Sequence, residues 1–279
     1  MSMPNIQVGD ISLYYETQGQ HGSPLILIHG YAATTIDWMP EQIEQFAARH
    51  RVLIFDNRGV GQSDKPTTSY NMAQLAADTI GLLDSLDIEK THVLGVSMGG
   101  MIAQHVALDY PDRVLGLILG CTTAVGKPDH SHFISPSDDV FKVLTRPLTG
   151  DRAQDTRDGW PIFYSPHYIC TQRDVLEQRL AVKLMYPKTP SHTLELQMAA
   201  IHQHDTFVRL EDIQSPTLVQ TGLADILMPS QNSKVLAQRI PTSRLIEYTG
   251  AAHVYLDEVG PLAIDDILAF LREVDIGDI

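Results

Sequence analysis

Residues 92–104 read HVLGVSMGGMIAQ, and within them Ser97 lies between Gly95 and Gly99. An apolar run over 91–96 that is typical of a buried strand ends here, and a helical pattern over 98–110 begins. A serine at so sharp a turn takes a strained backbone conformation, and small neighbours let the helix approach the strand. Its hydroxyl then lies at the helix N-terminus, where N–H groups favour developing negative charge. The pattern predicts a nucleophile; the alternative is a Gly-rich turn that contains a serine by chance.

The segments around this junction predict an α/β fold with a doubly wound, mostly parallel sheet. Alternating residues over 6–17, with Gly9-Asp10 as a turn, indicate a hairpin. The short apolar run over 24–30 is typical of a strand buried on both faces, 51–56 and 216–222 indicate further buried strands, and 113–120 and 243–250 are also expected to form strands. Helical patterns alternate with these runs: one lies between Trp38 and His50, one over 71–87 with Asn71 as N-cap, and one starts at Pro261.

The alternation breaks after residue 121. The next buried strand begins near 216, and the intervening residues contain helical segments such as TQRDVLEQRLAVKLMY and turn clusters such as HSHFISPSDD. This connection is much longer than the 2–6 residues typical of such folds. We therefore expect a core built from residues 1–121 and 211–279, with an inserted helical cap over 122–210.

A serine nucleophile needs a base, and the base needs an acid that orients it. In a parallel sheet these groups belong on loops after later strands. His253 follows the strand at 243–249 and is the only histidine after His204, and Asp225 follows the strand at 217–221. Asp257 and Glu258 lie too close to His253 in sequence to orient it easily. The prediction is therefore Ser97, His253 and Asp225, with a turn aspartate and a surface histidine as the alternatives.

Two backbone N–H groups are expected to stabilise the oxyanion. One is the N–H of Met98, directly after the nucleophile, and the other is the N–H of Tyr31, in the loop after LILIHG. The side chain of Tyr31, with Trp160, Phe163 and Met185 from the cap, is a candidate substrate contact. Met98, Met101, Leu184 and Met198 suit either a pocket lining or core packing.

Composition limits the classes of function. The 279 residues carry a formal net charge of −14 and no basic stripe, which argues against nucleic acid or an anionic membrane as a partner. The N-terminus lacks a secretory signal pattern, and no apolar run is long enough to span a bilayer. Cys121 and Cys170 are expected to be reduced thiols, and the protein to be cytoplasmic.

The motifs LILIHGYAATTIDW, DNRGVGQSDKP, GVSMGGMIAQ, TGLADILMP and GAAHVY occur in this order. With them the chain resembles the α/β-hydrolase superfamily over essentially its whole length, and within it the capped carboxylesterase, enol-lactonase and methylesterase branch. The resemblance implies the same triad and oxyanion donors, and a structural loop over Asp56–Pro66. The serine nucleophile argues against haloalkane dehalogenases and epoxide hydrolases, and the absence of an HGGG motif argues against lipases.

The expected function is cleavage of a small-molecule carboxylic ester or lactone through an acyl-enzyme on Ser97, with no cofactor and no metal. C–C bond hydrolysis and perhydrolysis use the same triad and stay open, because the cap and pocket set the chemistry. A slow-turnover small-molecule receptor is the non-enzymatic alternative. HQHD at 202–205 lacks the spacing of a metal site and is interpreted as the end of a cap helix. The sequence leaves the oligomeric state open.

Overall fold

The computed structural model describes residues 5–127, 130–144, 146 and 149–279. Its centre is an eight-stranded sheet in the order β1-β2-β4-β3-β5-β6-β7-β8. The strands are β1 (Asn5–Val8), β2 (Ile11–Gln18), β3 (Pro24–Ile28), β4 (Arg51–Phe55), β5 (Thr91–Val96), β6 (Val114–Gly120), β7 (Thr217–Gly222) and β8 (Ser243–Tyr248). β1–β2 and β2–β4 pair antiparallel, and every other neighbouring pair is parallel. The predicted fold class and strands are confirmed.

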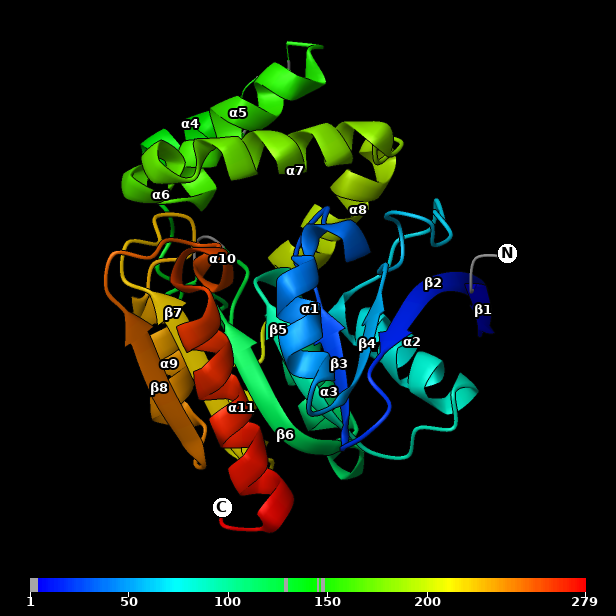
Figure 1. Ribbon diagram of the computed structural model, residues 1–279. Helices are drawn as coiled ribbons and strands as arrows, with labels where there is room; N and C mark the ends of the chain where they lie inside the picture. The colour runs from blue at the N-terminus through cyan, green and yellow to red at the C-terminus, as the bar shows by residue number, and fades with distance from the viewer. Residues whose placement is uncertain (1–4, 128–129, 145, 147–148) are drawn as a thin grey trace.

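Helices cover both faces of the sheet, as Figure 1 shows. One apolar cluster joins the sheet to α2 (Met72–Ser85), α3 (Met98–Asp109) and α9 (Gln231–Arg239). A second joins the opposite face to α1 (Pro40–Ala47), α10 (Tyr255–Val259) and α11 (Pro261–Ile276). This arrangement is the doubly wound fold that the alternation of strands and helices predicts. α9 and α10 are elements that the sequence patterns do not identify.

Local signals account for where the predicted helices begin. The Asn71 side chain accepts a hydrogen bond from Gln74 N at 2.9 Å and caps α2, as expected. Pro261 occupies the first turn of α11, where its missing N–H costs no hydrogen bond. α1 starts at Pro40, two residues later than the segment predicted from Trp38, because a 3₁₀ turn, η1 (Thr35–Asp37), precedes it.

In the described part of the chain, five helices lie between β6 and β7 and stand over the carboxyl ends of the parallel strands (Figure 1). They are α4 (Asp138–Leu144), α5 (Arg152–Phe163), α6 (Pro166–Thr171), α7 (Arg173–Met185) and α8 (Ser191–Gln203), followed by η3 (Phe207–Asp212). Trp160, Leu176 and Leu180 form an apolar cluster of their own, separate from those of the sheet. An inserted helical cap is therefore present; its limits at 122 and 210 stay a prediction.

Two further expectations concern the chain as a whole. Cys121 is buried, Cys170 is exposed, and both are free thiols. In the part of the chain that the structure describes, none of the helices has the length and apolar character needed to cross a membrane.

Candidate active site

Ser97 forms a strained turn between β5 and α3. Its φ of 56° and ψ of −122° lie in a region that L-residues seldom occupy. The turn is fixed by neighbours, because Ser97 N donates to Gly120 O at 2.9 Å and Thr122 Oγ1 donates to Ser97 O at 2.7 Å. This places the Ser97 side chain at the carboxyl edge of the sheet.

The two flanking glycines are required by packing. A Cβ on Gly95 would lie 2.3 Å from Gly99 O, and one on Gly99 would lie 2.0 Å from Ile28 O. Both approaches are to backbone atoms, which cannot move aside. Gly30 also faces the turn, since a Cβ there would lie 3.1 Å from Ser97 Cβ. The close packing of α3 against β3 and β5 therefore depends on residues without side chains.

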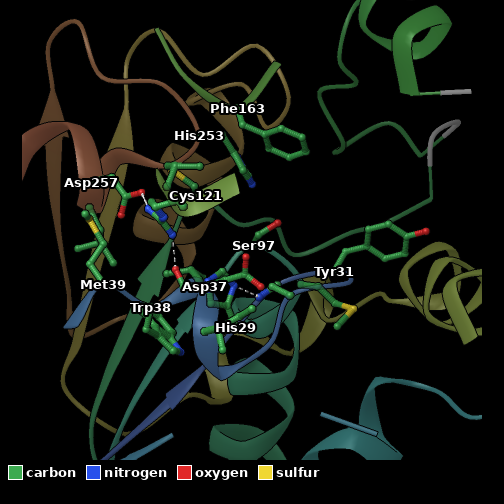
Figure 2. A pocket seen from close by; sticks show the side chains of 18 of the residues that line it. His29, Tyr31, Asp37, Trp38, Met39, Ser97, Cys121, Phe163, His253 and Asp257 are labelled. Atoms are coloured by element: carbon green, nitrogen blue, oxygen red, sulfur yellow. Dashed lines mark hydrogen bonds and ion pairs between the residues drawn. The ribbon is translucent and has the colours of Figure 1, made fainter. Parts of the chain in front are cut away.

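His253 and Asp225 meet through a buried hydrogen bond. His253 Nδ1 lies 2.8 Å from Asp225 Oδ2, and the second oxygen of Asp225 accepts from Leu227 N at 2.9 Å and Met228 N at 2.8 Å. Because the carboxylate can only accept, Nδ1 carries the proton and Nε2 keeps its lone pair. His253 and Ser97 line the same cavity, on loops after different strands (Figure 2).

The two predicted oxyanion donors are unpaired. Among the described residues, neither Tyr31 N–H nor Met98 N–H has a hydrogen-bond acceptor. The loop of Tyr31 is held from the cap, because Ala32 N donates to the Gln197 side chain of α8 at 2.9 Å and Gln197 Nε2 donates to Arg58 O at 3.3 Å. Gln197 is fully buried. It therefore links α8 to the loop that carries one predicted donor.

A cavity of about 1220 Å³ lies beneath the cap helices. Tyr31, Trp160 and Phe163 line it, and the ring centroids of Phe163 and His253 are 6.1 Å apart. Met98, Met101 and Met198 also line it. The structure does not bring Met185 or Leu184 to the cavity: Met185 is the last residue of α7 and is 81% exposed. A substrate contact from Met185 is therefore not supported.

The cap contacts the loop that carries His253. Val254 N donates to Phe163 O at 3.0 Å. Ser165, the N-cap of α6, donates to Glu258 from both its backbone N, at 2.9 Å, and its hydroxyl, at 2.5 Å. Glu258 also accepts from Ala252 N at 3.1 Å. Glu258 therefore holds the residue before His253 and the cap at the same time.

Two ion pairs connect α7 to the core beside the cavity. Lys183 Nζ lies 2.8 Å from Asp37 Oδ1, and Arg179 contacts the carboxylate of Asp257 (Figure 2 labels both aspartates). Burial acts to raise the pKa of Asp37, but the charges of Lys183 and His29 and hydrogen bonds outweigh it and hold that pKa at about 2. Burial raises the pKa of Asp257, and the Arg179 guanidinium opposes this shift.

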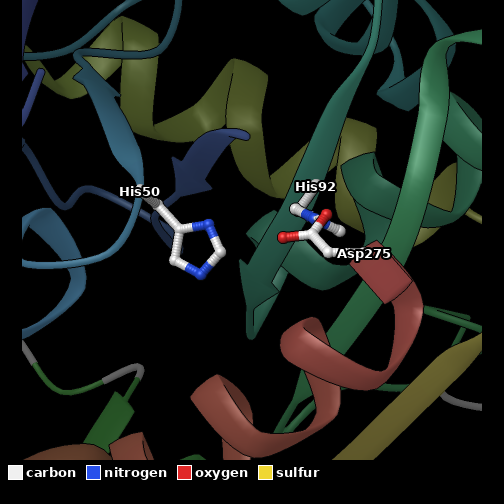
Figure 3. Close-up of side chains that lie close together, drawn as sticks. All are labelled: His50, His92 and Asp275. Atoms are coloured by element: carbon white, nitrogen blue, oxygen red, sulfur yellow. Dashed lines mark hydrogen bonds and ion pairs between the residues drawn. The ribbon is translucent and has the colours of Figure 1, made fainter. Parts of the chain in front are cut away.

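Among the described residues, two groups of side chains place potential metal ligands close to one another. Cys121, Asp225 and His253 offer ligand atoms within 4.8 Å of one another, but the carboxylate and imidazole already bond to each other. His50, His92 and Asp275 form the second group, at the far end of the sheet (Figure 3). An ion on His92 Nε2 would move the ring proton to Nδ1, which is buried without a partner. Neither arrangement fits a resident metal ion.

HQHD at 202–205 is the end of a cap helix, as expected. α8 ends at Gln203, His202 is exposed, and His204 is buried with Nε2 3.3 Å from Thr123 O. The loop after β4 also has the structural role expected of it, because the Asp56 carboxylate accepts from Thr35 N and Gln62 N, both at 2.7 Å.

Sequence patterns did not identify Gln197, Glu258, Arg179 or Thr122 as part of the site. Gln197 is a polar residue in the middle of a helical segment, and only its complete burial distinguishes it. Arg179 and Glu258 belong to charged runs typical of solvated helix faces. No spacing rule identifies these residues, because the contacts of Gln197, Arg179 and Glu258 between the cap and the core join segments that are distant in sequence.

Comparison with known proteins shows the family of the chain. The model of the alpha/beta hydrolase fold family matches residues 23–258. The protein named "Putative carbamate hydrolase RutD" of Azorhizobium caulinodans is 32% identical over 277 residues, covering 98% of this chain and all of that one. The 3-oxoadipate enol-lactonase 2 of Acinetobacter baylyi is 27% identical, covering 88% and 87%. The crystal structure of the enol-lactonase from Burkholderia xenovorans superposes with a TM-score of 0.82 at 25% identity, covering 97% and 100%.

Proposed function

Because the chain belongs to the alpha/beta hydrolase fold family, we propose that it is a cofactor-independent serine hydrolase that cleaves carboxylic esters or lactones. The observation that carries the proposal is the buried His253–Asp225 hydrogen bond in the cavity that Ser97 also lines. A relative named as an enol-lactonase supports this class of substrate. The substrate is a small molecule that binds beneath the cap, for which we propose residues 122–210.

Each residue has one role in the proposed reaction. His253 Nε2 takes the proton of Ser97 as the hydroxyl attacks the acyl carbon, and Asp225 holds the imidazole in the tautomer that permits this. The tetrahedral oxyanion is stabilised by the N–H groups of Met98 and Tyr31, which are free to donate. His253 then gives its proton to the leaving alcohol, and water resolves the acyl-enzyme by the same steps in reverse.

The strained turn at Ser97 supports a catalytic role over a purely structural one. A residue held at positive φ costs of order 1–3 kcal/mol, and such strain persists where the surroundings enforce it, often at active sites. Here Gly95, Gly99 and Gly30 leave the space that this conformation needs. A tight turn that contained a serine by chance would account for the strain and for the unpaired Met98 N–H at the start of α3, but not for a second unpaired N–H, that of Tyr31, on a separate loop.

Carbamate hydrolysis is a second candidate for the same site. The relative named as a carbamate hydrolase is 32% identical and matches nearly the full length of both chains. This sequence identity is sufficient to place the two proteins in one family. A carbamate carbonyl is attacked through the same tetrahedral intermediate, so the residues keep their roles. The two candidate reactions differ in the leaving group and in the reactivity of the carbonyl carbon. Electron donation from the carbamate nitrogen makes that carbon less electrophilic than the carbonyl carbon of an ester.

The test is steady-state hydrolysis of p-nitrophenyl acetate and butyrate, a γ-lactone and a phenyl carbamate, by the wild type and Ser97→Ala. Sustained turnover of esters or the lactone that is lost in the variant supports the proposal. Turnover of the carbamate alone favours the second candidate. A single burst equal to the enzyme concentration, or ligand-induced stabilisation without turnover, would indicate a receptor and contradict both.

A further inference from the structure

We propose that the cavity over Ser97 selects uncharged, bulky apolar substrates and rejects esters that carry a carboxylate of their own, because both of its cations are already paired with aspartates. The inference rests on the proposed function and adds the substrate class.

The positive charges of the lining come from one helix. Among the described residues that line the cavity, the lysine and arginine side chains are those of Lys183 and Arg179, both on α7. They lie one helical turn apart, and each forms an ion pair with an aspartate of the core, Arg179 with Asp257 and Lys183 with Asp37. A substrate carboxylate therefore has these two side chains as its possible cationic partners.

Lys183 is held by Asp37. The two charged groups lie 2.8 Å apart, and the other carboxylate oxygen of Asp37 accepts from Thr34 N at 2.8 Å and Thr34 Oγ1 at 3.2 Å. With its pKa near 2, Asp37 stays ionised at neutral pH. A substrate carboxylate would have to displace a partner that is already positioned by the backbone.

Arg179 has more partners than Lys183. Its guanidinium contacts the Asp257 carboxylate and donates from Nη2 to Asp37 O at 2.6 Å. The Asp257 side chain is 3% exposed and also accepts from Gln42 Nε2 at 2.9 Å. Removing Arg179 from this pair would leave Asp257 buried without its charge partner, which is costly.

The remaining charges of the lining are negative. Glu16, Glu41 and Asp155 add three carboxylates to those of Asp37 and Asp257, so the lining carries five carboxylates and two cations. The lining also contains large apolar side chains, among them Met101, Phe163 and Met198. An anion buried here would be unpaired, whereas a neutral apolar group would gain from leaving water.

The volume of the cavity also favours a bulky apolar substrate. Pockets for drug-sized ligands are typically about 300–1,000 Å³. The cavity here has about 1220 Å³. Its rim includes the half-exposed apolar side chains of Tyr31, Val182 and Tyr186, which would contact a large substrate as it enters. A bulky apolar acyl or alcohol group fits this space, and a short dicarboxylic acid does not use it.

The first experiment compares p-nitrophenyl hexanoate with mono-p-nitrophenyl adipate, which have the same leaving group and acyl length and differ in the terminal carboxylate. Each rate is divided by that of uncatalysed hydrolysis. We expect kcat/KM for the neutral ester to exceed that for the acidic ester by about tenfold or more, the effect of one poorly solvated charge. Equal values, or a preference for the acidic ester, would overturn the proposal.

The second experiment tests the cause of the selectivity. Asp37→Asn keeps the shape of the side chain and an oxygen for Thr34, but it releases Lys183. The ratio of kcat/KM for the acidic ester to that for the neutral ester should rise several-fold. Glu41→Gln is the matched control, because it removes a charge from the same lining without releasing a cation; it should change the ratio much less. Equal changes in the two variants would overturn the role of the Asp37–Lys183 pair.

A binding measurement separates failure of this inference from failure of the proposed function. Hexanophenone and 5-benzoylpentanoate have the same length and differ in the same terminal carboxylate, and neither has an ester to cleave. Thermal stabilisation of the wild type by the ketone and not by the acid supports the inference even if no ester is hydrolysed. Equal stabilisation by the two compounds contradicts it even if Ser97 proves to be the nucleophile.

Discussion

Ser165 in the cap and Glu258 in α10 are joined by two hydrogen bonds, of 2.9 Å from the Ser165 backbone N and 2.5 Å from its hydroxyl. The same carboxylate accepts from Ala252 N, one residue before His253. The position of the proposed base therefore depends on how the cap lies on the core. Asp257, the neighbour of Glu258, bonds to Arg179 of the cap as well. Two adjacent carboxylates thus connect the cap to the segment that follows His253.

Glu258→Ala should lower kcat about tenfold, because hydrogen bonds to a charged group contribute about 1.5–3 kcal/mol and part of this fixes the His253 loop. Ser165→Ala is the matched control: it removes the hydroxyl contact and leaves the contact to Ala252, so its effect on kcat should be smaller. The measurements are kcat for an ester substrate, the rate of Ser97 labelling by a fluorophosphonate, and the melting temperature. A lower melting temperature with unchanged kcat and labelling rate would mean that Glu258 is only structural.

The glycine that follows the nucleophile by two residues should tolerate no side chain. In Gly99→Ala the new Cβ would meet Ile28 O at 2.0 Å, so α3 must move away from β3 and distort the turn at Ser97. We expect loss of activity and a loss of stability of several kcal/mol. Gly150→Ala is the control, with φ of +90° and open space around its Cβ. It should cost about 1–2 kcal/mol at most and keep full activity. Urea denaturation and ester hydrolysis measure both; an active Gly99→Ala would contradict the role of close packing.

The fold could be predicted from the sequence because the burial of each strand and helix determines where apolar residues occur along the chain. β3, β4 and β5 are buried on both faces, so their residues are apolar without alternation, and α2 has both an apolar stripe and an Asn71 cap. α9 did not follow from the sequence, because its apolar residues are few and only Leu236 and two small polar residues are strongly buried.

Some residues of the candidate site could also be predicted from the sequence, and others could not. Ser97, Asp225 and His253 follow strand ends, and the sheet brings such ends together, so spacing along the chain was sufficient to select them. Gln197, Arg179 and Glu258 act through contacts between the cap and the core. Where a helix of the cap lies above the sheet depends on tertiary packing that no local pattern records. Met185 shows the same difficulty, since an apolar residue at a helix end can point to solvent as easily as to a cavity.

His204 should make the protein less stable as the pH falls. Burial, and to a smaller extent the nearby His105, lower its pKa from 6.5 to about 3. The unfolded chain therefore binds a proton below about pH 6.5 that the folded protein does not. Stability is complete above this pH and falls by about 1.4 kcal/mol per pH unit for this histidine as the pH drops towards 3.

The measurement is the free energy of unfolding in urea between pH 7.5 and pH 5. His204→Gln, whose amide can still donate to Thr123 O, should reduce the slope by about one proton. His202→Gln, at an exposed position near the end of α8, is the control. His29, with its pKa lowered by burial to about 4, should retain a similar contribution in both variants. Identical slopes in the two variants would show that His204 does not titrate in this way.

Gln197 should affect catalysis by holding the loop of Tyr31. In Gln197→Ala the partly buried N–H of Ala32 loses its acceptor at 2.9 Å, and the loop that presents the Tyr31 N–H loses its connection to α8. Since removal of one oxyanion donor costs about 10²–10³ in kcat in a serine protease, a displaced donor should cost about 10-fold or more. Gln203→Ala, at an exposed position of the same helix, is the control.

The decisive comparison is the affinity for a trifluoromethyl ketone, which forms the tetrahedral adduct, against that for the matching methyl ketone. If Gln197 positions the donor, the variant weakens binding of the first compound much more than the second, because only the adduct carries an oxyanion. Equal weakening of both would assign Gln197 to the shape of the cavity instead.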